Sequence, residues 1–204
     1  MENLPETVNT QSVALAIYNP TPGTKAIDIR RQMLQLPEVA KSLSGVEKYI
    51  FAASTKMQIA DIDDGTLIAK TGQMFRFIAM DVGYIIPTNP EDWAYICTRL
   101  LDILKKYYSQ MTLADIKLAF ELATTGELDD YLPKDSQGNP DKKHYQQFNA
   151  DYFAKILNAY RRKQNGVIHK AYKALPEPKK ELTPEEKRYY HNQTVARCRD
   201  CLLY

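Results

Sequence analysis

The chain of 204 residues is 44% hydrophobic and 25% charged, which suits one domain, or one domain with a tail, and excludes wholesale disorder. Its net charge of +2 is unevenly placed: residues 1–133 hold 12 Lys+Arg against 17 Asp+Glu (−5), and residues 134–204 hold 15 against 8 (+7). The basic second half indicates a polyanionic partner or an acidic protein surface, with a solvated Lys/Arg face as the alternative.

The cysteine count and the N-terminal sequence favour a cytoplasmic protein. Three cysteines, Cys97, Cys198 and Cys201, form no even secretory framework. The N-terminus MENLPETVNTQ has neither a basic start nor an apolar core typical of a signal peptide. No stretch approaches 18 uncharged apolar residues, so we expect no membrane contact.

Residues 1–24 form an N-terminal extension, which Pro20, Pro22 and Gly23 close. A first helix is predicted from Ala26, and Pro37 opens a short second one, where its missing N–H costs nothing. A third is predicted over residues 45–59 from its helical apolar spacing. The expected core faces are Ile29, Met33 and Leu36 in the first helix and Val46, Tyr49, Ile50 and Ala53 in the third.

The turn at residues 61–65, DIDDG, supplies acids that can cap a fourth helix over residues 66–82. It superficially resembles a calcium loop, but its glycine stands at position 5 instead of 6, and Gly72 replaces the glutamate of position 12. The helix itself is apolar on nearly all sides, which is typical of a central helix. Gly83 is its expected C-terminal cap.

The clearest helix start is Asn89 at the cap, followed by Pro90, Glu91 and Asp92. Apolar residues then recur at helical spacing, which predicts a core-facing stripe. The stripe comprises Trp93, Ile96, Cys97, Leu100, Leu101 and Leu104.

Two further helices complete the expected core. Thr112 and Asp115 form a near capping box, and Gly126 ends that helix. Residues 129–148 are polar and contain prolines, so we expect a long mobile loop before Asn149 caps the last core helix. The stripes are Leu113, Ile116, Ala119, Phe120 and Ala123, and then Phe153, Ile156, Leu157 and Tyr160.

Since no convincing strand pattern occurs, the predicted fold class is all-α: a compact multi-helix domain over residues 25–174. A Pro/Lys-rich linker follows over residues 175–183. The capping box TPEE at residues 183–186 then starts a polar C-terminal helix within residues 184–204.

No enzyme signature is present in the sequence. GxxxxGK[ST], GxSxG and HExxH are all missing, and the three histidines lack ligand spacing. Cys198 and Cys201 form a lone CxxC; His191 and a second chain could complete a zinc site, but two ordinary thiols are the default because zinc requires four ligands. We therefore expect a non-enzymatic protein without cofactor or metal.

The most informative feature is a basic stretch interleaved with aromatic residues from Lys155 onward. Cations neutralise phosphates and rings stack on exposed bases, which suits single-stranded or non-specific nucleic acid. Against this, Tyr160 continues a core stripe, and helix C-termini attract Lys and Arg for dipole reasons alone. The predicted nucleic-acid contacts are Lys155, Arg161, Arg162, Lys163, Lys170 and Lys173.

Three segments between Pro90 and Asn165 carry a resemblance: PEDWAYICTRLLDIL, MTLADIKLAFELATTGEL and FNADYFAKILNAYRRKQ. Their order resembles small helical replication-accessory proteins of phages and mobile elements, especially Bacteroidetes-type phages, and the helical domains of phage helicase loaders and replisome organisers. The resemblance implies an adaptor that brings a replicative helicase to an origin or to single-stranded DNA. Because the phosphate loop of ATPase loaders is missing, nucleotide-driven loading is excluded.

In proteins of that kind, a flexible C-terminal segment contacts the helicase. The resemblance therefore implies that the tail meets a replicative helicase or another replication protein, through Arg188, Tyr189, Tyr190 and Arg197. The alternative is a phage or mobile-element interaction module, such as an inhibitor, regulator or virion component. In that case the positive charge would be solvated surface with no role in DNA binding.

Overall fold

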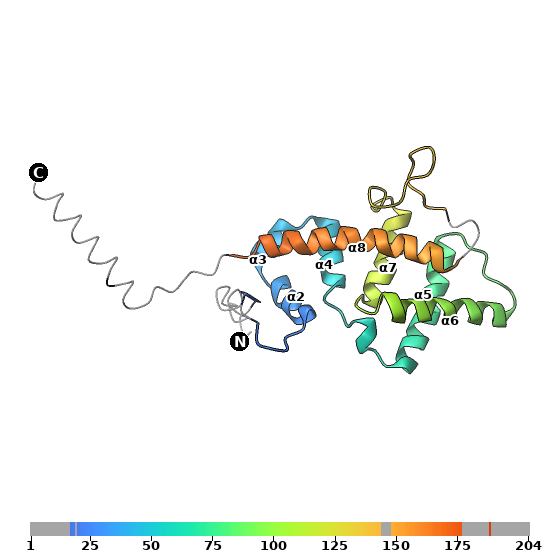
Figure 1. Cartoon of the computed structure of the whole chain (residues 1–204), viewed down its shortest axis with the longest axis horizontal. Helices are drawn as coiled ribbons and strands as arrows, with labels where there is room; N and C mark the ends of the chain where they lie inside the picture. The colour runs from blue at the N-terminus through green and yellow to red at the C-terminus, as the bar shows by residue number, and fades with distance from the viewer. Residues whose placement is uncertain (1–16, 19, 144–147, 177–187, 189–204) are drawn as a thin grey trace, which may run out of the picture.

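The computed structural model describes residues 17–18, 20–143, 148–176 and 188, and within these ranges the fold is all-α (Figure 1). No strand occurs in the described part; two isolated bridges pair Gln58 with Thr112 and Lys134 with Pro140. The elements are α2 (Ala26–Leu34), α3 (Pro37–Ser42), α4 (Gly45–Ala53), the 3-10 turn η1 (Ile59–Asp61), α5 (Asp64–Asp81), α6 (Pro90–Tyr107), α7 (Leu113–Thr124) and α8 (Ala150–Lys173).

The helix starts predicted at Asn89, at Asn149 and after the acidic turn are confirmed by side-chain caps. Asn89 accepts a hydrogen bond from the Glu91 amide at 3.1 Å. Asn149 accepts one from the Tyr152 amide at 3.1 Å. The acidic turn before α5 has the predicted role, because Asp63 accepts a hydrogen bond from the amide of Thr66 at 2.9 Å. These caps satisfy backbone donors that the first helical turn leaves unpaired, so the helix starts are set by the local sequence.

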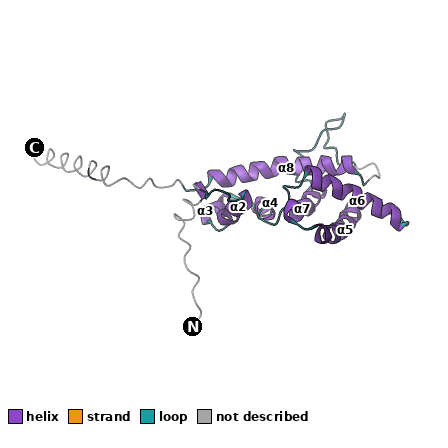
Figure 2. Ribbon diagram, turned by 60° about the horizontal axis from the view of Figure 1, so that its bottom comes forward, coloured by secondary structure: helices purple, strands orange, loops and turns teal. Residues whose placement is uncertain are grey.

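The domain is organised around α8, which has 24 residues and a length of about 36 Å. It runs along most of the domain, with α2, α3 and α4 towards one end and α5, α6 and α7 towards the other (Figure 1). A second view shows the shorter helices gathered along one side of α8 (Figure 2). One side of α8 therefore faces the hydrophobic core, and much of the opposite side faces solvent.

An aromatic cluster fills the core where α8 meets α5 and α7. The Phe153 ring centroid lies 4.6 Å from that of Phe120, 4.8 Å from that of Phe148 and 5.5 Å from that of Phe75. Phe153 is fully buried. The predicted core stripe of this helix, Phe153, Ile156, Leu157 and Tyr160, is confirmed, and it continues through Gln164, Val167 and Ala171.

A buried carboxylate joins α7 to α8. One oxygen of Asp115 accepts hydrogen bonds from the Tyr160 hydroxyl and the Gln164 amide, both at 2.8 Å. The other accepts one from the backbone N–H of Thr112 at 2.9 Å. The Thr112 hydroxyl in turn donates to the carbonyl of Ala53, at the end of α4, at 3.1 Å. The predicted capping box is thus also a tertiary junction between three helices.

The prediction for residues 45–59 is wrong in two respects. Tyr49, expected in the core, is 71% exposed, while Ile50 and Phe51 are buried. The helix also ends at Ala53. Beyond it, the amides of Ile59 and Ala60 donate to carbonyls of the α6–α7 connection at 2.8 and 2.9 Å, so non-local backbone pairing replaces the last helical turns.

The expectation that the fourth helix is central is also wrong. α5 packs mainly on α6 and α7 at the edge of the domain. Its buried residues are Leu67, Thr71, Phe75, Ile78 and Ala79, whereas Ile68, Phe77 and Met80 are exposed. Burial in the core of the same domain does not explain why a helix at its edge exposes these apolar side chains.

The segment expected to be a mobile loop is anchored over its described residues, 129–143 and 148. Leu132 is buried, and a turn is closed by the Asp135 amide donating to the Asn139 carbonyl at 2.8 Å. Ion pairs join Lys142 to Asp129 and Lys155 to Asp141. Residues 144–147, most of the predicted linker and nearly all of the predicted C-terminal helix lie outside the described residues.

The buried Asp115 carboxylate yields a stability prediction. Asp115→Ala removes the capping acceptor and leaves the buried Tyr160 hydroxyl and Gln164 amide without it, so we expect a loss of about 3 kcal/mol in the free energy of unfolding. Urea denaturation measures this difference. The matched control is Asp102→Ala, an exposed position on α6, which should change the free energy by less than about 0.5 kcal/mol. Equal midpoints for the two variants would contradict the assigned role.

Candidate nucleic-acid interface

Three of the six cations predicted to bind nucleic acid are engaged within the protein. Lys155 forms an ion pair with Asp141 at 2.8 Å, and the two side chains are only 11% and 20% exposed. Lys163 contacts the carboxylate of Glu127 at 2.9 Å and its backbone carbonyl at 2.6 Å. These two lysines therefore form ion pairs between α8 and the segment that connects α7 to α8.

Lys170 joins the far end of α8 to α4. Its ammonium group donates to both carboxylate oxygens of Glu47, at 2.7 and 3.0 Å. Glu47 also completes a capping box with Ser44 at the start of α4. The hydrogen bond from Lys170 is the main reason why the pKa of Glu47 lies below its usual value. The position of Lys170 is therefore also explained by the fold.

The other three predicted cations, Arg161, Arg162 and Lys173, are exposed. No ion pair to any of them occurs among the described residues. The sequence from residue 152 to residue 176 contains no Asp or Glu at all. We call this solvent-exposed side the basic face of α8; it comprises Asn158, Arg161, Arg162, Asn165, His169, Tyr172 and Lys173.

The basic face of α8 begins at a groove against α6. Arg161 and Asn158 line it from α8, and Arg99 and Tyr107 line it from α6. Its volume is about 500 Å³, and the only acid among its described lining residues is Asp151. Asp151 stands in the first turn of α8, where a carboxylate stabilises the helix dipole. We call this hollow the α6–α8 groove.

Aromatic rings and cations lie close together in and beside this groove. The Arg161 guanidinium is 5.9 Å from the centroid of the Tyr108 ring, and the Lys106 ammonium is 5.2 Å from that of Tyr107. Tyr108 is buried and its hydroxyl contacts Asn158 at 3.3 Å, whereas Tyr107 is 61% exposed. The exposed Tyr107 ring thus lines the same groove as Arg99 and Arg161, an arrangement suited to an unstacked base and its phosphates.

The contribution of α6 was not predicted from the sequence. Its groove-lining residues, Arg99, Ile103 and Tyr107, recur every four residues, and Tyr95, one step earlier, lines an adjacent hollow that also contains Arg99. That four-residue spacing is visible in the sequence, but the apolar core stripe of the same helix is the stronger pattern and obscures it. Only the packing of α6 beside α8 brings Arg99 and Arg161 to one groove.

Several predicted residues and features lie elsewhere. Of the partner-binding candidates, Arg188 is helical and exposed, while Tyr189, Tyr190 and Arg197 fall outside the described residues, as do Cys198 and Cys201.

Burial raises the pKa of the half-buried Cys97 thiol to about 11. The described ranges hold no group of three potential metal ligands, and none of their helices is both long and apolar enough to cross a membrane.

Comparison with known proteins adds no relative: no family model matches the chain, and no curated protein or solved structure is significantly similar to it. Arguments about its function therefore depend on its own residues.

The internal ion pair of Lys155 yields a second prediction. Lys155→Met leaves the carboxylate of Asp141 in a poorly solvated position without its cation, so we expect the free energy of unfolding to fall by about 1–2 kcal/mol. Lys173→Met, at an exposed position of the same helix, should change it by less than about 0.5 kcal/mol. Thermal or urea unfolding followed by circular dichroism measures both variants. A Lys155→Met protein as stable as wild type would show that the ion pair is dispensable.

Proposed function

We propose that this chain is a non-enzymatic nucleic-acid-binding accessory protein that holds a single strand along the α6–α8 groove and the basic face of α8. The observation that carries the proposal is that Arg161 and Arg162 are exposed and form no ion pair within the described residues, in a stretch, residues 152–176, that contains no Asp or Glu. Cations that already have intramolecular partners gain little from a phosphate, whereas exposed unpaired ones release counterions when they bind it.

The geometry favours a single strand over a duplex. Tyr95 and Tyr107 are both exposed, and they stand about 18 Å apart along α6, as the rise of 12 helical residues requires. Arg99 lies between them in the sequence and lines both the hollow with Tyr95 and the groove with Tyr107. Flat rings flanking a guanidinium suit bases that are free to stack, and the bases of a duplex are already stacked on one another.

The wider role proposed for the chain is that of a DNA-replication adaptor of a phage or mobile element. In this proposal the basic face of α8 holds DNA, and the C-terminal segment that contains Arg188 meets a replicative helicase or another replication protein. The support is the resemblance of residues 90–165 to such proteins, together with the segregation of positive charge on α8. Pull-down of the helicase by the full chain, and its loss on deletion of residues 184–204, tests the protein contact.

A second candidate function is supported by a separate observation. Lys155, Lys163 and Lys170 are occupied within the fold, and α5 exposes Phe77 and Met80. Both features suit a protein-interaction module with no DNA role. In that case charge reversal on α8 would leave the activity intact.

The two candidates are separated by reversing charge on α8. Arg161→Glu/Arg162→Glu should lower the affinity for single-stranded DNA at least tenfold, because two cations become two anions facing phosphates. For the wild type, the logarithm of the binding constant should fall with the logarithm of salt concentration with a slope of about −3 if four cations contact phosphates. Fluorescence anisotropy across a salt titration measures both quantities.

The matched control is Arg76→Glu, an exposed arginine on α5 that lines none of the grooves described. It should reduce affinity much less than a single reversal at Arg161 does. If wild-type protein fails to bind at low salt, or binds without salt dependence, the nucleic-acid proposal is wrong.

Stacking on α6 gives a prediction of its own. Tyr107→Ala should weaken binding of single-stranded DNA by about 1–3 kcal/mol, since that is the range measured for base–aromatic stacking. Binding of a duplex should change much less. Tyr49→Ala, an exposed tyrosine on α4, is the control and should leave both affinities unchanged. An equal loss for single and double strands would argue against stacking.

A further inference from the structure

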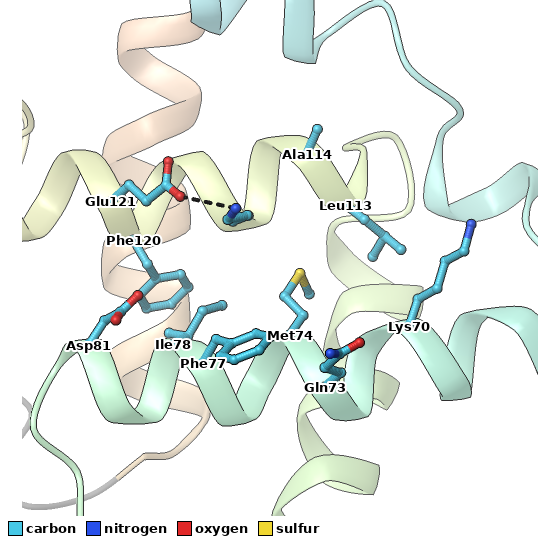
Figure 3. A pocket seen from close by; sticks show the side chains of 11 residues that line it. Lys70, Gln73, Met74, Phe77, Ile78, Asp81, Leu113, Ala114, Phe120 and Glu121 are labelled. Carbon is cyan, nitrogen blue, oxygen red and sulfur yellow. Dashed lines mark ion pairs between the residues drawn. The ribbon is translucent and has the colours of Figure 1, made fainter.

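The exposed apolar surface of α5 belongs to a groove between α5 and α7. The groove has a volume of about 380 Å³. Met74, Phe77 and Ile78 line it from α5, and Leu113 and Phe120 line it from α7 (Figure 3). Met74 and Leu113 are partly buried, and Phe77 is 55% exposed. This apolar hollow is distinct from the α6–α8 groove, with which it shares no lining residue.

Four residues of α5 form a symmetric stripe along this groove. Lys70, Met74, Phe77 and Asp81 all line it, at spacings of four, three and four residues. These spacings place them on one side of a helix, and they are the spacings at which two helices interlock their side chains. Figure 3 shows Lys70 at one end of the groove and Asp81 at the other, with the two apolar residues between them.

The two end charges have no intramolecular partner among the described residues. Neither Lys70 nor Asp81 takes part in an ion pair or a side-chain hydrogen bond there. By contrast, Lys117 and Glu121 on the α7 side of the groove pair with each other at 3.4 Å. The stripe therefore combines a partly exposed apolar centre with one free positive end and one free negative end.

We propose that this stripe is the interface through which two copies of the chain form a two-fold symmetric dimer. A two-fold axis across the middle of the stripe runs α5 of one copy antiparallel to α5 of the other. Lys70 of each copy then faces Asp81 of the second copy, and Met74 of each faces Phe77 of the second copy. Both pairings occur twice, as a self-complementary interface requires.

The charges on the stripe select a second copy as its occupant. An apolar groove alone accepts many apolar partners, but a stripe that is positive, apolar, apolar and negative complements its own reverse. The flexible thioether of Met74 can adapt to the Phe77 ring across the axis. Dimerisation also explains why α5 is apolar on nearly all sides: one side faces its own core and another faces the second copy.

The first test measures the mass of the full chain by sedimentation velocity as the protein concentration is raised. The wild type should convert from monomer to dimer, and Phe77→Asp should remain monomeric over the same range. Since Phe77 is more than half exposed, the variant should keep the wild-type circular dichroism spectrum and melting temperature. A wild type that stays monomeric at every concentration would overturn the proposal.

The second test is an exchange of charge. Lys70→Glu alone and Asp81→Lys alone each create two like-charge contacts across the axis, so each should weaken the dimer roughly tenfold. The double variant, Lys70→Glu with Asp81→Lys, restores opposite charges in both contacts and should dimerise nearly as well as the wild type. Arg76→Glu, on another side of α5, is the control and should leave the dimer unchanged.

The exchange of charges between positions 70 and 81 also distinguishes this dimer from other ways of occupying the groove. If the double variant dimerises more weakly than both single variants, the antiparallel pairing is wrong. DNA binding is measured on the same variants and should be retained when dimerisation is lost, because the stripe shares no residue with the α6–α8 groove or the basic face of α8.

Discussion

The buried carboxylate of Asp115 is the constraint on which the arrangement of the helices depends. It caps the first turn of α7 and accepts hydrogen bonds from Tyr160 and Gln164 on α8. Burial raises its pKa above the ordinary value, although the hydrogen bonds it receives act in the opposite direction. A carboxylate withdrawn from water is tolerated only where its partners are fixed, so it sets the register of α7 against α8.

That register decides which side of α8 is free. Once Tyr160 and Gln164 are turned towards Asp115, Arg162 lies on the opposite side of α8, and Arg161 and Asn165 lie on the exposed flank between the two sides. The same rotation brings Arg161 beside α6 and Lys163 within reach of Glu127. Rotation alone does not divide the six basic residues into paired and unpaired groups, because Lys155 and Lys173 are 18 residues apart and point in the same direction. Lys155 has an ion-pair partner because the loop before α8 brings Asp141 to it.

The sequence predicts local features of this fold better than distant ones. The caps at Asn89, Thr112 and Asn149 and the core stripe of α8 depend on neighbouring residues, and all are confirmed. The partners of Lys155, Lys163 and Lys170 lie 14, 36 and 123 residues away, so no local pattern could show that these cations are occupied. The α6–α8 groove was missed for the same reason: Arg99 becomes informative only once it lies near Arg161.

Hydrophobic periodicity alone could not place α5 correctly in the domain. A helix that is apolar on nearly all sides must bury more than one side, but the pattern does not say whether its own domain or another molecule covers the second side. Here one side is filled by Phe75 and its neighbours. The other carries Phe77 between two unpaired charges of opposite sign. Charges at such positions would be costly in a domain core and are well suited to the edges of an interface. The composition of α5 is thus accounted for by two different burials, one within its domain and one between copies of the chain.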